Sequence, residues 1–206
     1  ALSTDDVRAM TNTQLRSLSS TVLSGMSTAQ LNAISTSLVT NLAGGAISAL
    51  SSTQIQSLST SHINALSATQ IKALSASAIG SMTTTQINNL SDTQVKSLTT
   101  AQVAAMSTDQ VAALTTAQIA SIESADLVSI KAEALASLST SQIRALTNSQ
   151  MSVLTADQLS HLTTAQIASG LTTAQVTGID INKLGNFSSS QIRALTTGQV
   201  SALRDR

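Results

Sequence analysis

Residues 98–121 read LTTAQVAAMSTDQVAALTTAQIAS, which is one pattern of eight residues written three times. The pattern is Leu-Ser/Thr-Thr-x-Gln-Ile-x-Ala, and it can be followed outward in both directions. The octads keep their phase from residue 2 to 169 and again from 171 to 202, with Gly170 as a single inserted residue. A repeat that holds its phase over 25 octads predicts one regular architecture, a single repeat domain over residues 1–206.

Each position of the octad has its own character. Positions 1 and 6 are apolar in 25 of 25 octads, and position 2 is Ser or Thr in 21 of 25. Position 5 is Gln in 16 of 25 octads, and position 8 is Ala, Ser or Gly in 20 of 25. Position 7 varies most and holds six of the ten basic residues. We therefore expect position 7 to face solvent.

The spacing of the apolar positions excludes a continuous helix and a continuous strand. Eight residues of α-helix advance by about 800°, roughly 80° beyond two full turns, so an apolar stripe would wind around the helix. In a strand, positions 1 and 6 would lie on opposite faces because side chains alternate. The octad must therefore contain a break.

A helix start in every octad satisfies the pattern. Ser or Thr followed three residues later by Gln is a capping box, and the apolar residues on either side of it form a hydrophobic staple. Leu146 and Met151 across Thr147 and Gln150 show all four parts. The sequence predicts an all-α solenoid of very short capped helices, about six residues each, which neighbours must bury. The alternative is a β-solenoid, which Ser, Thr and Gln ladders suit but the apolar spacing and scarcity of Gly do not.

The composition argues against several classes of function. The formal net charge is zero, only 10% of residues are charged, and Phe187 is the single aromatic residue. This leaves no basic footprint for nucleic acid and no stacking platform for bases or sugars. The chain has no Cys and no apolar run long enough for a membrane span. We assign no catalytic, cofactor-binding or metal-binding residue and predict a protein that is not an enzyme.

Residues 122–137 form the first divergent segment, IESADLVSIKAEALAS. This segment lacks Gln and gathers Glu123, Asp126, Lys131 and Glu133. A carboxylate cluster with catalytic or metal-binding chemistry is one interpretation. We favour a longer, fused helix with surface charges and an acidic first turn that suits the helix dipole.

Residues 179–186 form the second divergent segment, IDINKLGN. Asp180, Asn182 and Gly185 match part of the spacing of a calcium-binding loop. A leucine and Gln191 stand where that loop requires oxygen ligands, including its bidentate Glu. We therefore interpret Asp180 as a helix N-cap that replaces the usual Ser or Thr.

The remaining irregular residues form no recognisable site. His62 takes the Gln position of its octad and His161 the small-residue position, so a shared site requires the solenoid to bring distant octads together. Gly44 and Gly45 interrupt the capping box, and we expect a bend or a flexible joint there. No serine lies in a G-x-S-x-G nucleophile motif.

Residues 98–121 resemble the LSTTQI-type octapeptide arrays of very large bacterial secreted or surface proteins. Those proteins are labelled adhesins, haem-utilisation proteins or type I-secreted repeat proteins. The resemblance covers nearly the whole chain and implies a bacterial, extracellular, non-enzymatic setting. It transfers no functional residues, and two separated histidines without an aromatic wall give haem little support.

We expect a structural protein, a solenoid rod that is cut from or belongs to a longer array, as the start at Ala1 suggests. Low charge and apolar ends favour end-to-end or lateral self-association. Its partners are then further copies of itself, and cell-surface or matrix components are further candidates. One alternative is a solenoid binding module for a protein or surface ligand. Another is ice or mineral binding by rows of Thr at positions 2 and 3.

Overall fold

A computed structural model describes residues 2–204 of the chain, and these residues form only helices and the short segments between them. The chain divides into two compact units, residues 1–105 and 106–206, which we describe separately. No strand occurs in the described range, so the prediction of an all-α solenoid is confirmed and the β-solenoid alternative is wrong. Between residues 2 and 204, no helix combines the length and the apolar character that crossing a membrane requires.

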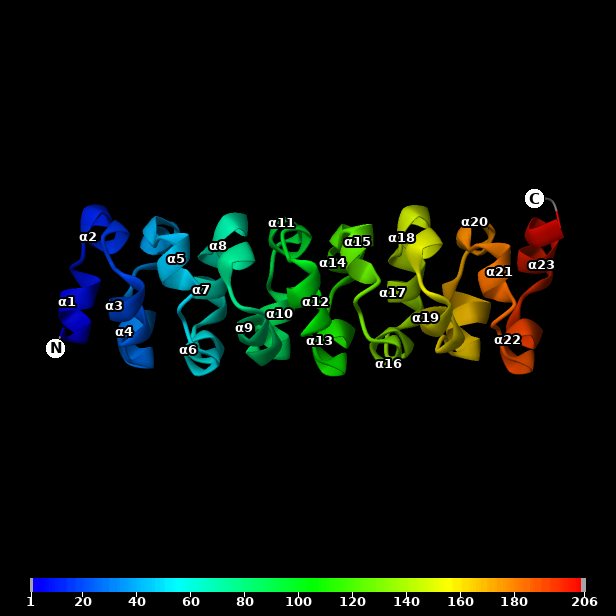
Figure 1. The fold of residues 1–206 in the computed structure, drawn as a ribbon, viewed down its shortest axis with the longest axis horizontal. Helices are drawn as coiled ribbons and strands as arrows, with labels where there is room; N and C mark the ends of the chain where they lie inside the picture. Colours follow the sequence, from blue (N-terminus) through cyan, green and yellow to red (C-terminus); the bar gives the residue numbers. More distant parts are fainter. Residues whose placement is uncertain (1, 205–206) are drawn as a thin grey trace. The chain divides into compact units, whose positions relative to one another are not determined.

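Unit 1 contains one short helix per octad, and these helices follow one another in chain order (Figure 1). Most of them have five or six residues, as the octad predicts. They are α1 Thr4–Arg8, α2 Asn12–Arg16, α3 Ser20–Ser24, α4 Thr28–Ala33, the 3₁₀-helix η1 Thr36–Asn41, α5 Gly44–Ile47, α6 Ser52–Ser57, α7 Thr60–Ala65, α8 Ala68–Ala73, α9 Ala76–Ser81, α10 Thr84–Asn88, α11 Asp92–Lys96 and α12 Thr100–Ala104.

Unit 2 repeats this design up to α23, which is longer than the other helices. Its helices are α13 Thr108–Ala112, α14 Thr116–Ser121, α15 Ser124–Leu127, α16 Ala132–Ala136, α17 Thr140–Ala145, α18 Asn148–Val153, α19 Ala156–Ser160, the π-helix η2 Gln166–Gly170, α20 Thr173–Gly178, α21 Ile181–Leu184, α22 Ser189–Ala194 and α23 Thr197–Arg204.

The boundaries of a regular helix follow from the predicted capping box. Ser67 precedes α8 in extended conformation, with φ −68° and ψ 159°, and its side chain accepts a hydrogen bond from the backbone N–H of Gln70. The Gln70 side chain in turn accepts from the backbone N–H of Ser67. At the other end Leu74 returns to φ −62° and ψ 145°, which stops the helix and starts the next octad. The same reciprocal pair recurs in both units.

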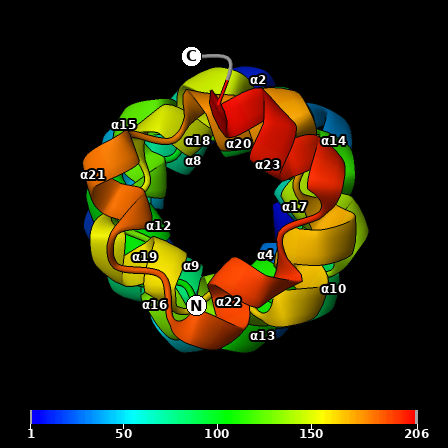
Figure 2. The ribbon, with the colours of Figure 1, turned by 90° about the vertical axis from the view of Figure 1, so that its right-hand side faces the viewer.

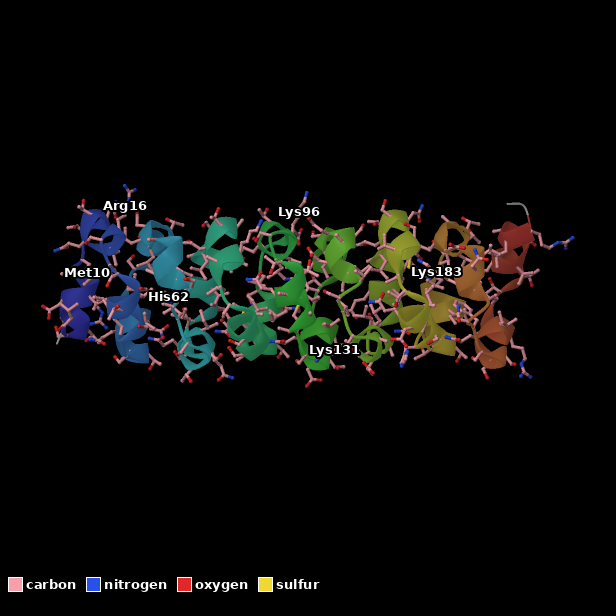
Figure 3. The ribbon with its side chains drawn as sticks, viewed as in Figure 1. Met10, Arg16, His62, Lys96, Lys131 and Lys183 are labelled. Carbon is pink, nitrogen blue, oxygen red and sulfur yellow. The ribbon has the colours of Figure 1, made fainter. Side chains whose placement is uncertain are left out.

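The hydrophobic core consists of the residues at positions 1 and 6. Leu146 and Met151, the predicted staple, are both buried, and residues at the same positions recur throughout the core of each unit. Residues at position 7, such as Arg16 and Lys96, are exposed and point away from the ribbon (Figure 3), as predicted. Because each helix is too short to persist alone, its stability depends on burying this pair against neighbouring octads.

Helices three octads apart pack against each other, which defines the winding of each unit. In unit 1, α6 lies against α9 and α5 against α8, and in unit 2, α20 lies against α23. Figure 2 shows α20, α21, α22 and α23 placed in order around a common axis, with α23 returning beside α20. Side-chain hydrogen bonds between successive turns join residues 28 and 31 apart. One turn therefore takes between three and four octads.

The divergent segment 122–137 does not form a fused helix, and that prediction was wrong. It forms α15 and α16, separated by residues 128–131. Ile130 and Leu135 are both buried, so the octad's core positions are kept although the side chains of Glu123 and Lys131 make no capping hydrogen bond. The need to bury positions 1 and 6 overrides the local preference of AEALA for a continuous helix.

The two glycines at 44 and 45 also differ from expectation. They form the first residues of α5 instead of a bend, and neither has a positive φ. The helix α5 keeps its place in the winding because it packs against α3 and α8. Glycine here removes the capping side chain without interrupting the repeat.

Gly170, the single inserted residue, is absorbed inside one helix. The turn Gln166–Gly170 is a π-helix, in which the backbone N–H of Leu171 donates to the carbonyl oxygen of Gln166 at 2.8 Å. A π-turn accommodates one extra residue within a helical turn. The next octad resumes the normal pattern, with Thr172 and Gln175 forming the capping box of α20.

Gly80 in α9 is expected to be intolerant of a side chain. A Cβ atom at this position would lie 2.8 Å from the backbone carbonyl oxygen of Ala105, so α9 and the end of α12 would have to separate. We expect Gly80→Ala to destabilise unit 1 by about 1–3 kcal/mol in urea denaturation, the usual cost of overpacking. Gly45→Ala is the matched control, because nothing lies within 4 Å of its added Cβ. Equal stability of the two variants would contradict the close approach of α9 and α12.

Candidate functional site

The most distinctive polar feature of the structure is the side chain of the glutamine at position 5. In α12, the Oε1 atom of Gln102 accepts from the backbone N–H of Thr99 at 2.8 Å, which completes the capping box. Its Nε2 atom donates to the carbonyl oxygens of Ile71 at 2.9 Å and Leu74 at 2.7 Å, in the preceding turn. Only 1% of Gln102 is exposed. One amide therefore caps its own helix and binds the end of an earlier one.

This arrangement recurs in both units, and we call it the glutamine ladder. In each rung the Nε2 atom donates to a position-1 carbonyl oxygen of the preceding turn at 2.6 to 2.8 Å. These carbonyl groups lie at helix C-termini, where no intrahelical N–H is left to satisfy them. The ladder includes Gln54, Gln70, Gln86, Gln94, Gln102, Gln142, Gln150, Gln158, Gln166, Gln175, Gln191 and Gln199.

His62 replaces glutamine in one rung and keeps the bond to a position-1 carbonyl oxygen, whereas the backbone N–H of Ser59 donates to Asn32 instead of completing a capping box. The Nε2 atom lies 2.7 Å from the carbonyl oxygen of Ile34, so it carries the proton and donates. The Nδ1 atom lies 2.6 Å from Ser59 Oγ and accepts from that hydroxyl when the ring is neutral. The side chain is buried and lies inside unit 1 (Figure 3). His62 is therefore a structural rung.

Variants of His62 test this assignment. His62→Gln restores the usual rung and is expected to leave the free energy of unfolding within about 0.5 kcal/mol, because an amide can make the same bond to Ile34. His62→Leu leaves the carbonyl oxygen of Ile34 without its donor and should cost about 1–3 kcal/mol. Urea denaturation followed by circular dichroism measures both. A glutamine variant as unstable as the leucine variant would show that the imidazole is needed for something else.

Three charged residues take the same position in other octads, namely Asp6, Asp126 and Lys183. Lys183 Nζ donates to the carbonyl oxygens of Ser152 at 3.0 Å and Leu154 at 2.8 Å, which reproduces a rung without the capping box (Figure 3). Asp6 keeps the capping box with Ser3. The hydrogen bond from the backbone N–H of Ser3, followed by that from the Ser3 hydroxyl, holds the pKa of Asp6 below its usual value.

The residues of segment 122–137 are not gathered into a site. Glu123, Lys131 and Glu133 are exposed, whereas Asp126 is buried at position 5 of its octad. Within residues 2–204, no three His, Asp or Glu side chains lie close enough to hold a metal ion. The interpretation as a carboxylate cluster therefore has no structural support.

Asp180 acts as the N-cap of α21, as predicted. Its Oδ1 atom accepts from the backbone N–H of Asn182 at 2.9 Å. Asn182 and Gly185 belong to the same short helix and its end, so the partial calcium-loop spacing corresponds to a capped helix.

The two histidines belong to different units and have separate local partners. His161 is exposed in unit 2, and its Nδ1 atom donates to the carbonyl oxygen of Asp157 at 2.9 Å. His62 binds Ser59 and Ile34 in unit 1, as described above. Unit 1 also encloses a cavity of about 20 Å³, which His62 of α7 and apolar side chains of α3, α4, η1 and α5 help to line. That volume is close to the space that one water molecule needs.

Comparison with known proteins supports a repeat array. Residues 92–121 and 119–156 match the model of the ALTTAQ repeat. A search of curated proteins gives no match. One matching solved structure is a leucine-rich repeat-containing protein from Legionella pneumophila, with 14% identity over 99% of this chain and 88% of that chain. Its TM-score is 0.22, which carries no argument about the fold.

Proposed function

We propose that this chain is a non-enzymatic structural spacer, whose reach is set by the number of octads and which associates with further copies of itself. The observation that carries the proposal is the glutamine ladder. The same rung joins successive turns in unit 1 and in unit 2, so every added octad brings an equivalent interface. In such solenoids stability is approximately a sum over repeats and their neighbours.

The use of the polar side chains supports a structural role over a catalytic one. Hydroxyl groups at position 2 accept hydrogen bonds from helix N-termini, and the buried amides at position 5 bind carbonyl oxygens. The buried imidazole of His62 has both nitrogens engaged. Acid–base catalysis needs a side chain that is free to exchange a proton with a substrate. In this chain the recurrent polar groups are already bound within the fold.

The proposed location is outside a bacterial cell, at the surface or in a matrix. Its support is the resemblance of residues 98–121 to the octapeptide arrays of secreted and surface proteins. A hydroxyl-rich chain with zero formal net charge would also have little long-range repulsion between copies. Self-association is supported by exposed apolar side chains in the first and last described turns: Leu2, Val22, Ile192 and Val200.

Electron microscopy and sedimentation of the purified chain over a concentration series test this function. We expect uniform particles that grow with concentration, and helical circular dichroism in every fraction. Insertion of seven octads in phase should lengthen each particle without changing its width. A chain that stays monomeric at millimolar concentration would refute the self-association. Particles whose length does not follow octad number would refute the spacer.

A further inference from the structure

The first turn of unit 1 has ladder donors that lack some or all of the carbonyl partners of an interior rung. Gln14 completes its capping box with Thr11, but its side chain is exposed and its Nε2 atom has no hydrogen-bond partner among the described residues. Gln30 is half-buried and reaches a single carbonyl oxygen, that of Leu2. Gln54, one turn later, is buried and binds the carbonyl oxygens of Leu23, Ser24 and Met26. A complete rung therefore requires a preceding turn.

A hollow of about 320 Å³ lies beside Gln30. It is lined by Leu2, Thr21, Val22, Gly25, Met26 and Gln30. Leu2 and Val22 are 42% and 43% exposed. Three octads later, the equivalent place beside Gln54 is filled by α3, whose Leu23 is completely buried. The hollow therefore corresponds to the place that a helix of the preceding turn fills elsewhere in unit 1.

The last turn of unit 2 presents the complementary groups. Ile192 in α22 and Val200 in α23 stand at position 6, which is buried in the interior octads, yet they are 48% and 43% exposed. No side-chain donor among the described residues reaches the carbonyl oxygens of Phe187 and Leu195, although position-1 carbonyl groups are the acceptors of interior rungs. This turn offers apolar knobs and open acceptors.

We propose that the chain binds a second copy of itself head to tail, with α22 and α23 of one copy seated in the hollow beside α3 of the other. This rests on the proposed self-association and specifies its contact. Ile192 and Val200 would cover Val22 and Leu2, and Gln14 would donate to the open carbonyl oxygens of the partner. The contact continues the interface that already joins successive turns within each unit. Octads that precede or follow these turns in a longer chain would use the same groups.

The two surfaces of this contact are different, which makes the interface heterologous. In such an interface, each added copy leaves one unused surface at either end of the complex. The complex therefore grows as an open chain or closes into a ring, and does not stop at a symmetric dimer. A head-to-tail contact therefore uses two different surfaces, whereas lateral association would use the same surface on both partners.

Three glutamate variants test the contact, because a carboxylate cannot donate to a carbonyl oxygen. Val22→Glu changes the hollow, Ile192→Glu with Val200→Glu changes the knobs, and Val128→Glu is the control. Val128, the C-cap of α15, is 39% exposed and belongs to none of the octads that form the two surfaces. Because all four side chains are exposed, the variants should keep the helical circular dichroism of the parent. We expect the hollow variant and the knob variant to lose at least tenfold in association constant by sedimentation, and the control to lose nothing.

Mixing the hollow variant with the knob variant provides the sharper result. The knob variant still has an intact hollow and the hollow variant still has intact knobs, so an equimolar mixture should form dimers and stop there. Association that persists unchanged in all three variants would overturn the head-to-tail contact while leaving the proposed self-association standing. A parent chain that never associates would refute both.

Discussion

Replacing Gln102 by Glu is expected to destabilise unit 1 by about 3–5 kcal/mol at neutral pH, the cost of a buried charge without a partner. The carboxylate can still accept from the backbone N–H of Thr99, as Oε1 does now. At the place of Nε2, however, an oxygen would face the carbonyl oxygens of Ile71 and Leu74, and none of the three could donate. Gln and Glu have nearly the same shape, so the loss isolates the donor.

The same variant should recover stability in acid. A carboxyl facing two carbonyl oxygens can bind them only when protonated, so folding raises its pKa above the unfolded value. A group with a raised pKa in the folded state contributes stability below its unfolded pKa and loses it as pH rises through the folded pKa. Relative to the parent, Gln102→Glu should therefore be most stable near about pH 4 and least stable above about pH 7.

Urea denaturation at a series of pH values measures this effect, and Gln56→Glu is the matched control. Gln56 stands at position 7 and its side chain is exposed, so the same change of charge should alter stability by no more than about 0.5 kcal/mol. If Gln102→Glu were as stable as Gln56→Glu at neutral pH, the ladder would not be an energetic part of the fold.

Removing residues 82–89, one complete octad, is expected to leave unit 1 folded, whereas removing residues 82–85 should abolish its cooperative unfolding. After the eight-residue deletion, Gln94 faces the C-terminal end of α6, where the carbonyl oxygens of Ile55 and Leu58 take the place of those of Ile63 and Leu66. The rung therefore forms again with equivalent partners, and the main loss is one neighbour interface.

The four-residue deletion has a different consequence because it breaks the phase. It removes Met82 and Thr83, the staple residue and the N-cap of α10. It also shifts the donors of the following octads by half a repeat, so that Gln94 faces the middle of a helix instead of its C-terminus. Several rungs fail together. Thermal unfolding followed by circular dichroism compares the two deletions, and similar melting temperatures would contradict the octad as the unit of structure.

Much of this fold is readable from the sequence because its determinants lie within eight residues. The capping box and staple around Thr147 are local, and they specify where a helix starts, how long it is and which face is buried. The winding is not local, because it depends on contacts such as those between Gln102 and the turn before it. The insertion at Gly170 is visible in the sequence, but its form as a π-turn depends on the packing around it.

The role of the glutamine side chain was only half predicted. A capping box accepts Glu as readily as Gln, since only an acceptor is needed. The sequence nevertheless uses Gln at position 5 in 16 octads and never uses Glu there. That exclusion was a signal for a required donor, and it points to the second partner that the structure reveals. The prediction of one helix over residues 122–137 was wrong because the burial of Ile130 outweighs the local helix propensity of this segment.

The short sequence distance between ladder partners has a mechanical consequence. Donor and acceptor in a rung are 28 to 32 residues apart, so no rung within a unit ties one end of that unit to the other. A unit pulled along its length would yield one turn at a time, and each event would release roughly 28 residues, or about 95 Å of extended chain. The remaining turns would keep their own rungs. Such a module would dissipate a sudden load in steps, by unfolding one turn at a time, and would refold when the tension falls.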